Sequence, residues 1–342
     1  MNLLFPKNAN KAYPLAGLIL LFLTGGYNAV GQSSNSFTSL QQPSFAKIAA
    51  LGGVNTSLYH GGNSFFLYNP ALLSDAGNDH LSLSYGLLPG GAGLSNANYT
   101  FGHSRFGTFG AGLQYLSYGQ IQGYDNTGAP TQVFSPSDFT FSISHARQAN
   151  NFRFGATLKF SNTSISGYSG NAILFDLGGV FIHPQKELTV GMAIKNFGFV
   201  TNEFSSTSNT TLPFNVQVGT SIKPEHMPIR FSITLHQLQQ WDLTHTDEEI
   251  NSFNTSLDNI FRHVVIAAEI ILNEHLSLLT GYNHLRRKDL RLGQSGGFSG
   301  FSIGTSISVK AFQLVYALGG YHVAGNTSTF TLATDLSQIT TK

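Results

Sequence analysis

The sequence predicts an all-β protein, a transmembrane antiparallel β-barrel of about 14 strands with an N-terminal plug inside the lumen. Three observations support this prediction. Only 10% of the 342 residues are charged, whereas a soluble domain has about 25%. After residue 31 the chain has no apolar run of about 18 residues, the length expected of a membrane helix. Apolar and polar residues instead alternate in short stretches, and the gaps between these stretches alternate between long and short.

Alternation is clearest in residues 152–160, where apolar side chains occupy every second position. Because successive side chains of a strand point to opposite faces, this pattern places one row on lipid and one in the lumen. Most of the stretches have about ten residues, enough for a tilted strand to cross the hydrocarbon layer. The predicted strands are 80–87, 93–102, 106–116, 138–146, 152–160, 172–181, 188–196, 214–222, 229–237, 263–272, 276–283, 300–309, 312–320 and 328–336.

The lengths of the gaps favour a membrane barrel over a soluble sandwich, which has no reason to sort its connections. The short gaps are 102–106, 147–151, 183–187, 223–228, 273–275 and 310–311. The long gaps are 117–137, 161–171, 197–213, 238–262, 284–299 and 321–327, and 88–92 is short where a long gap is expected. We expect the long loops to be extracellular and both termini periplasmic. The boundaries are soft, so about twelve or sixteen strands would also fit.

Residues 1–31 are predicted to be a secretory signal peptide. Lys7 and Lys11 precede an apolar stretch at 15–23, and the small residues Ala29 and Gly31 occupy the two recognition positions before the expected cleavage after Gly31. An anchoring helix is the alternative, but the apolar stretch is too short to span a bilayer. The mature chain would then reside in the outer membrane.

Residues 32–79 lack the strand pattern and are interpreted as the plug. Asn69 can cap a helix whose first position is Pro70, where the missing N–H is not needed. Fourteen strands enclose a lumen that side chains alone do not fill, so a folded segment is the simplest filling. The barrel is expected to span 80–336, and residues 337–342 to form a C-terminal tail that lacks a terminal aromatic residue.

Seven polar residues fall on the inward row by alternation. We expect them to pair with one another and with the plug, since enclosed charges require partners. The alternative is a binding site for a translocated ligand. These residues are Arg153, Lys159, Asp176, Lys195, Arg230, His236 and Glu269.

Two long loops carry opposite charge. The simplest interpretation is that these charged loop residues face water and have no further role. The alternative is docking, in which the basic loop contacts anionic lipopolysaccharide and the tryptophan-bearing loop contacts a protein at the cell surface. The residues concerned are Trp241, Asp242, Asp247, Glu248 and Glu249 in one loop, and Arg286, Arg287, Lys288 and Arg291 in the other.

Composition gives no sign of several other functions. A net charge of +1 offers no attraction for nucleic acid, and no basic stripe with interleaved aromatics appears. There is no Cys, the histidines are scattered singly, and no spacing suggests a metal or cofactor site. We expect a non-enzymatic protein. A barrel hydrolase remains a third possibility, because a Ser/His pair can meet only in the fold.

Several motifs resemble one family. They are Leu-Gly-Gly-Val at 51–54, Asn-Pro-Ala-Leu-Leu at 69–73, and the stretches 107–119, 212–219 and 228–243. Together they resemble the PorV and PorQ group of FadL-like outer-membrane barrels of the Bacteroidetes type IX secretion system, and its PorQ branch more closely. The resemblance implies a scaffold in a cell-surface attachment complex that anchors secreted cargo to lipopolysaccharide. It also implies the partners PorV, PorZ and the sortase-like PorU.

The main alternative is a FadL-type channel for uptake of hydrophobic small molecules. Such a channel needs an apolar pocket beside the plug and a lateral opening in the wall. Gly178 and Gly179 lie together in one predicted strand and could mark a bend, although glycine in a strand also marks a simple bulge.

Overall fold

The computed structural model describes residues 37–73, 79–204, 210–243, 252–290, 297–322 and 324–340. The predicted signal peptide lies outside these residues. In the described part of the chain, no helix has the length and apolar character needed to cross a membrane.

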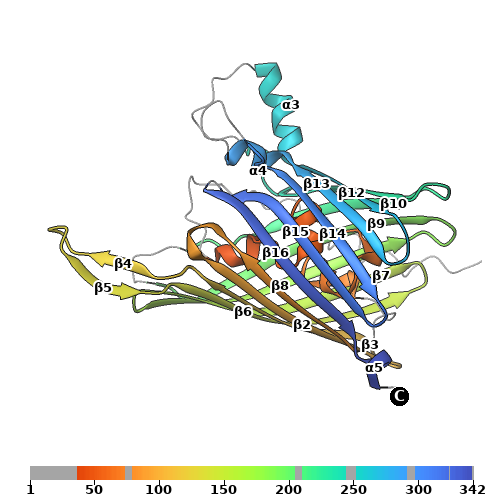
Figure 1. Cartoon of the computed structure of the whole chain (residues 1–342), viewed down its shortest axis with the longest axis horizontal. Helices are drawn as coiled ribbons and strands as arrows, with labels where there is room; N and C mark the ends of the chain where they lie inside the picture. The colour runs from red at the N-terminus through yellow and green to blue at the C-terminus, as the bar shows by residue number, and fades with distance from the viewer. Residues whose placement is uncertain are drawn as a thin grey trace, which may run out of the picture. The chain divides into compact units, whose positions relative to one another are not determined.

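Fourteen antiparallel strands close into one barrel, as predicted, and the alternatives of twelve and sixteen strands are wrong (Figure 1). Each strand pairs with its neighbour in the chain, and β1 closes the ring by pairing with both β2 and β16. The strands are β1 (His80–Leu87), β2 (Gly93–His103), β3 (Gly107–Ser117), β6 (Ser137–Ala149), β7 (Phe152–Ile165), β8 (Tyr168–Ile182), β9 (Glu187–Asn202), β10 (Asn215–Lys223), β11 (Ile229–Leu235), β12 (Val264–Ile271), β13 (Leu276–Asn283), β14 (Phe301–Val309), β15 (Phe312–His322) and β16 (Gly325–Asp335).

The two faces of the wall have different chemistry. In β7, Phe154 and Leu158 are 59% and 49% exposed on the outside, while Arg153 and Lys159 are 0% and 5% exposed on the inside. Large apolar side chains are exposed in the same way on all the other strands of the barrel, although β10, β12 and β13 have only one each that is more than a third exposed, namely Ile222, Ile266 and Leu278. An outer surface of this kind is stable in lipid and not in water.

Two predicted long gaps are wrong. β7 and β8 continue as a hairpin to a two-residue turn at Ser166 and Gly167, both with positive φ, so 161–171 is mostly strand. The pairing of β15 with β16 likewise extends to His322 and Gly325, within the predicted gap 321–327. The residues in these two gaps are largely polar, as in a loop. Backbone hydrogen bonds between the paired strands nevertheless continue beyond the apolar part of the wall.

Three of the other long connections, 117–137, 238–262 and 284–299, contain local structure. A hairpin of β4 (Ile121–Tyr124) and β5 (Pro130–Phe134) lies between β3 and β6. Helix α3 (Ser252–Arg262) lies between β11 and β12, and α4 (His284–Asp289) lies between β13 and β14. A 3-10 turn, η6 (Pro89–Gly91), connects β1 to β2, and α5 (Ser337–Thr340) follows β16.

Residues 37–73, hereafter the N-terminal segment, form short helices inside the ring of strands (Figure 1). Asn69 caps the 3-10 turn at Pro70–Leu72, and its side chain accepts a hydrogen bond from the Ala71 N–H at 3.0 Å. Pro70 occupies the first position of this turn, as predicted. Its apolar residues pack against inward side chains of the wall such as Val180, Leu279 and Val315. The helices are η1 (Thr38–Gln41), α2 (Ala46–Ala50), η2 (Tyr59–Gly61), η3 (Asn63–Leu67) and η4 (Pro70–Leu72).

Candidate functional site

Inward-facing glycines allow the backbone of the N-terminal segment to touch the wall. A Cβ at Gly155 would overlap the backbone of Pro70, and one at Gly281 would overlap the backbone of Gly52. At Gly304 in β14 it would lie 2.6 Å from the Ala50 Cβ. Sequence reasoning missed these glycines, although glycine in a strand does signal a close backbone approach.

Wall side chains hydrogen-bond the backbone of the segment. Thr331 accepts from the Ala46 N–H at 2.8 Å, and Asn96 donates to the Ser44 carbonyl at 2.7 Å. Ser302 accepts from the Gly52 N–H at 3.0 Å. Short helices leave many backbone N–H and C=O groups without a partner inside the helix, and buried groups of this kind must be paired. The wall side chains supply these partners.

A chain of ion pairs joins α2 to the wall. Lys47 contacts Glu269 on β12 at 2.8 Å, and Glu269 also contacts Arg230 on β11 at 2.6 Å. Arg230 reaches Glu187 at 3.0 Å, which in turn pairs with Lys223 at 3.0 Å. Of the seven predicted inward residues, Arg230 and Glu269 therefore meet directly, and the partner from the segment is Lys47.

A second polar cluster lies on the neighbouring strands β7, β8 and β9. Lys159 contacts Asp176 at 2.5 Å and donates to Asn196 at 2.9 Å. The register of β8 and β9 shifts here, so that Lys195 and Asn196 both lie opposite Asp176. The Lys195 ammonium lies 4.7 Å from the centre of the Tyr68 ring, a cation–π contact with the N-terminal segment.

The remaining two predicted inward residues lie apart from these clusters. Arg153 donates to Thr108 at 2.9 Å and to Gln148 at 3.3 Å. His236 follows β11, and its backbone N–H donates to the His263 carbonyl at 3.0 Å. His236 is buried, with 3% of the residue exposed.

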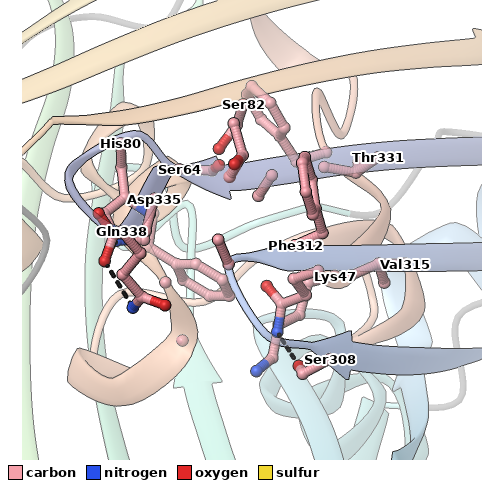
Figure 2. Close-up of a pocket in the computed structure, with 18 of the residues that line it drawn as sticks. Lys47, Ser64, His80, Ser82, Ser308, Phe312, Val315, Thr331, Asp335 and Gln338 are labelled. Carbon is pink, nitrogen blue, oxygen red and sulfur yellow. Dashed lines mark hydrogen bonds and ion pairs between the residues drawn. The ribbon is translucent and has the colours of Figure 1, made fainter. Parts of the chain in front are cut away.

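A cavity of about 360 Å³ separates the segment from β1, β15 and β16 (Figure 2). Phe45 and Phe65 from the segment and Phe312 from β15 supply aromatic surface. Charged and polar groups also line the cavity, and they include Lys47, His80, Lys310, Asp335 and Gln338. Because Lys310 belongs to a short connection, the cavity lies at the short-turn end of the barrel. Its volume is within the range of small-molecule sites.

The two charged loops contact each other instead of remaining separate. Asp258 on α3 accepts hydrogen bonds from Arg262 at 2.8 Å, His284 at 2.9 Å and Lys288 at 3.0 Å. Burial alone would raise the pKa of Asp258, but these three hydrogen bonds outweigh it and hold the pKa well below its ordinary range. Sequence reasoning did not identify Asp258.

The other predicted loop residues have different surroundings. The Arg286 guanidinium lies 4.2 Å from the Tyr321 ring centre and donates to the Gln41 carbonyl, so it contacts the N-terminal segment. Arg287 donates to the Gly297 carbonyl at 2.8 Å. Trp241 is 67% exposed and stacks on His263, and Asp242 accepts a hydrogen bond from Asn259. Asp247, Glu248, Glu249 and Arg291 lie outside the described residues.

The described residues contain no group of three or more His, Cys, Asp or Glu side chains that could hold a metal ion.

The structure is similar to those of solved channels. A deltaS2 mutant of the TodX monoaromatic hydrocarbon channel matches with a TM-score of 0.52 at 14% identity, covering 86% of this chain and 97% of that one. The Pseudomonas putida toluene transporter TodX matches with a TM-score of 0.50 at 13% identity, covering 89% and 98%. This chain has the TodX barrel fold. At such identities the likeness concerns the fold alone.

A Pseudomonas aeruginosa FadL homologue gives a TM-score of 0.43 at 11% identity, covering 89% of this chain and 99% of that one. No family model and no curated protein matches the chain. The barrel fold and its apolar outer surface make the protein an integral outer-membrane protein.

Proposed function

We propose that the protein is a FadL-type channel that passes small hydrophobic molecules across the outer membrane. The observation that carries this proposal is the fold shared with TodX, a channel for monoaromatic hydrocarbons, over 86% of the chain. We further propose that the long loops are extracellular, that both termini are periplasmic and that the protein is not an enzyme.

The cavity beside the N-terminal segment is the proposed ligand site. Its three phenylalanine rings provide apolar contact, and its volume of about 360 Å³ suits a small molecule. The segment would act as the plug, because it fills the lumen between the cavity and the end of the barrel that carries the long loops. A ligand could pass only when some of these contacts break.

The glycine pair at Gly178 and Gly179 does not supply a lateral opening. Both residues pair with β7 on one side and with β9 on the other. Gly178 faces inward and leaves room for Asn69. The register of β8 and β9 shifts instead between Asn171 and Ala172 and at Asp176, which contacts Lys159 and the Asn196 N–H. We therefore propose movement of the N-terminal segment as the gating step.

A reversible cross-link tests this mechanism. Ser57 of the segment and Ser221 of β10 have hydroxyl oxygens 2.8 Å apart, and the native chain has no Cys. We expect proteoliposomes with Ser57→Cys and Ser221→Cys to lose toluene uptake when oxidised and regain it when reduced. The single variant Ser57→Cys is the control. Uptake by the native protein no faster than by empty vesicles, or uptake unchanged by the cross-link, would contradict the proposal.

One observation favours a second candidate, the attachment scaffold. Two motifs that resemble the PorV and PorQ group, at 51–54 and 69–73, supply backbone that packs on wall glycines. A segment held in this way suits a rigid barrel that presents loops to lipopolysaccharide, PorV, PorZ and PorU. Affinity purification of the native protein from outer membranes tests this. Recovery of the barrel alone, with cargo attachment normal in a deletion strain, would reject the scaffold.

A further inference from the structure

Helix α3 carries an apolar face that the described part of the chain leaves uncovered. Leu257, Ile260 and Phe261 are 45%, 45% and 54% exposed. Their spacing of three and four residues places them on one side of the helix. An exposed face of three large apolar side chains needs an environment other than water.

The opposite side of α3 is anchored to the protein. Asp258 contacts His284 and Lys288 of α4, while Arg262 donates to the Leu243 carbonyl at 3.2 Å. Asn259 accepts from the Leu243 N–H at 3.2 Å. Asp258, Asn259 and Arg262 are thus directed toward the two loops, and these contacts determine the orientation of the helix.

The apolar face of α3 is continuous with the lipid-facing wall. The ring of Phe261 lies 6.0 Å from that of His284, which lies 6.0 Å from that of Tyr282. Tyr282 contacts Phe301 at 4.8 Å. Tyr282 and Phe301 lie on the outward rows of β13 and β14, where the pattern of burial alternates. A line of rings therefore connects the helix to the outer surface of the barrel.

The position of α3 agrees with this connection. Figure 1 shows the helix beside α4, to the side of the barrel near the ends of β12 and β13, and not over the barrel mouth. A helix with one apolar and one polar face that is not covered by protein can lie in the plane of a membrane, with its apolar face in the boundary between headgroups and acyl chains.

We propose that α3 is an interfacial helix that rests on the outer membrane, with Leu257, Ile260 and Phe261 inserted among lipid acyl chains. The lipid bilayer is the partner because the face continues the surface that already contacts lipid. This inference does not depend on whether the barrel is a channel or a scaffold.

Tryptophan fluorescence tests the proposal, since Trp241 is the only tryptophan of the chain. In a Trp241→Phe background, Phe261→Trp reports on the helix and Phe301→Trp on the wall. Tyr124→Trp is the aqueous control, because Tyr124 is 67% exposed on the β4–β5 hairpin. Each variant is reconstituted in phosphatidylcholine vesicles with or without bromine on the acyl chains.

We expect Phe261→Trp to lose emission in brominated vesicles as strongly as Phe301→Trp, while Tyr124→Trp keeps its emission and is quenched by acrylamide. Leu257→Trp should behave like Phe261→Trp. This second variant controls for a local structural disturbance caused by one of the substitutions. If both helix variants are quenched by acrylamide and not by brominated lipid, the proposal is overturned and the face is left for a protein partner.

Discussion

Single glycines determine how closely the N-terminal segment approaches the wall. Gly178 and Gly179 are neighbours in β8, but they face opposite sides. A Cβ at Gly178 would overlap the Asn69 side chain and lie 2.9 Å from the Pro70 Cδ, whereas one at Gly179 would meet only Phe154 at 3.9 Å. A side chain therefore does not fit on the inward face of β8 at Gly178, whereas one fits on the outward face at Gly179.

This difference yields a prediction with a built-in control. We expect Gly178→Ala to lower the free energy of unfolding by about 1 to 3 kcal/mol, the usual cost of overpacking a filled interior. Gly179→Ala should change it by less than about 0.5 kcal/mol, as an ordinary surface substitution does. Urea unfolding in lipid vesicles, followed by the fluorescence of Trp241, measures both. Equal effects would mean that the segment does not press on this wall.

Alternation determines which face a strand residue occupies, but it does not identify the partner. Glu269 and Arg230 could be assigned to the inward row from the sequence, whereas the pairing of Glu269 with Lys47 could not. Lys47 lies in a segment without strand periodicity, 222 positions before its partner in a 342-residue chain. Asp258 was missed for the same reason, because contacts between two loops leave no periodic signal.

At the scale of elements, the 14 strands were predictable because each one separates lipid from lumen over the part of its length that crosses the membrane. The ends of β7, β8, β15 and β16 were not, because above the lipid both faces meet water and the alternation stops. The helices α3 and α4 were also missed. Their residues are held by an ion-pair cluster that forms only when the two connections meet.

The pairing of α3 with α4 should depend on pH. The pKa of Asp258 is held below its ordinary range in the folded protein. A carboxyl with a lowered pKa contributes stability above its unfolded value, about 4, and this contribution is lost as the pH falls through the folded value. We therefore expect the contact to be maintained at neutral pH and to weaken in strong acid.

Hydrogen exchange of residues 252–262 measures this contact. Protection, corrected for the intrinsic pH dependence of exchange, should fall in acid in the native protein. In Asp258→Asn it should already be low at neutral pH and change little with acid. Asp125, on the β4–β5 hairpin, also has a lowered pKa, from hydrogen bonds with Thr127 and Ala129. Asp125→Asn is therefore the control and should leave protection of α3 unchanged.

At the scale of the whole molecule, the barrel and the N-terminal segment depend on each other. The wall turns small residues such as Gly155, Gly281 and Gly304 toward the lumen, and the segment occupies the space they leave. Fourteen strands without this filling would enclose a wider, water-filled lumen. The closed ring of backbone hydrogen bonds does not require the segment, so the wall should form without it.

Deletion of residues 37–73 tests this division of roles. We expect the shortened protein to insert into membranes and to conduct ions steadily in a planar bilayer, whereas the native protein conducts little. The oxidised cross-linked variant should conduct even less than the native protein, because its segment cannot leave the lumen. Deletion of residues 252–262 is the matched control, since α3 lies beside the barrel and not within it. Equal ion conductance with and without the N-terminal segment would show that the segment does not close the barrel.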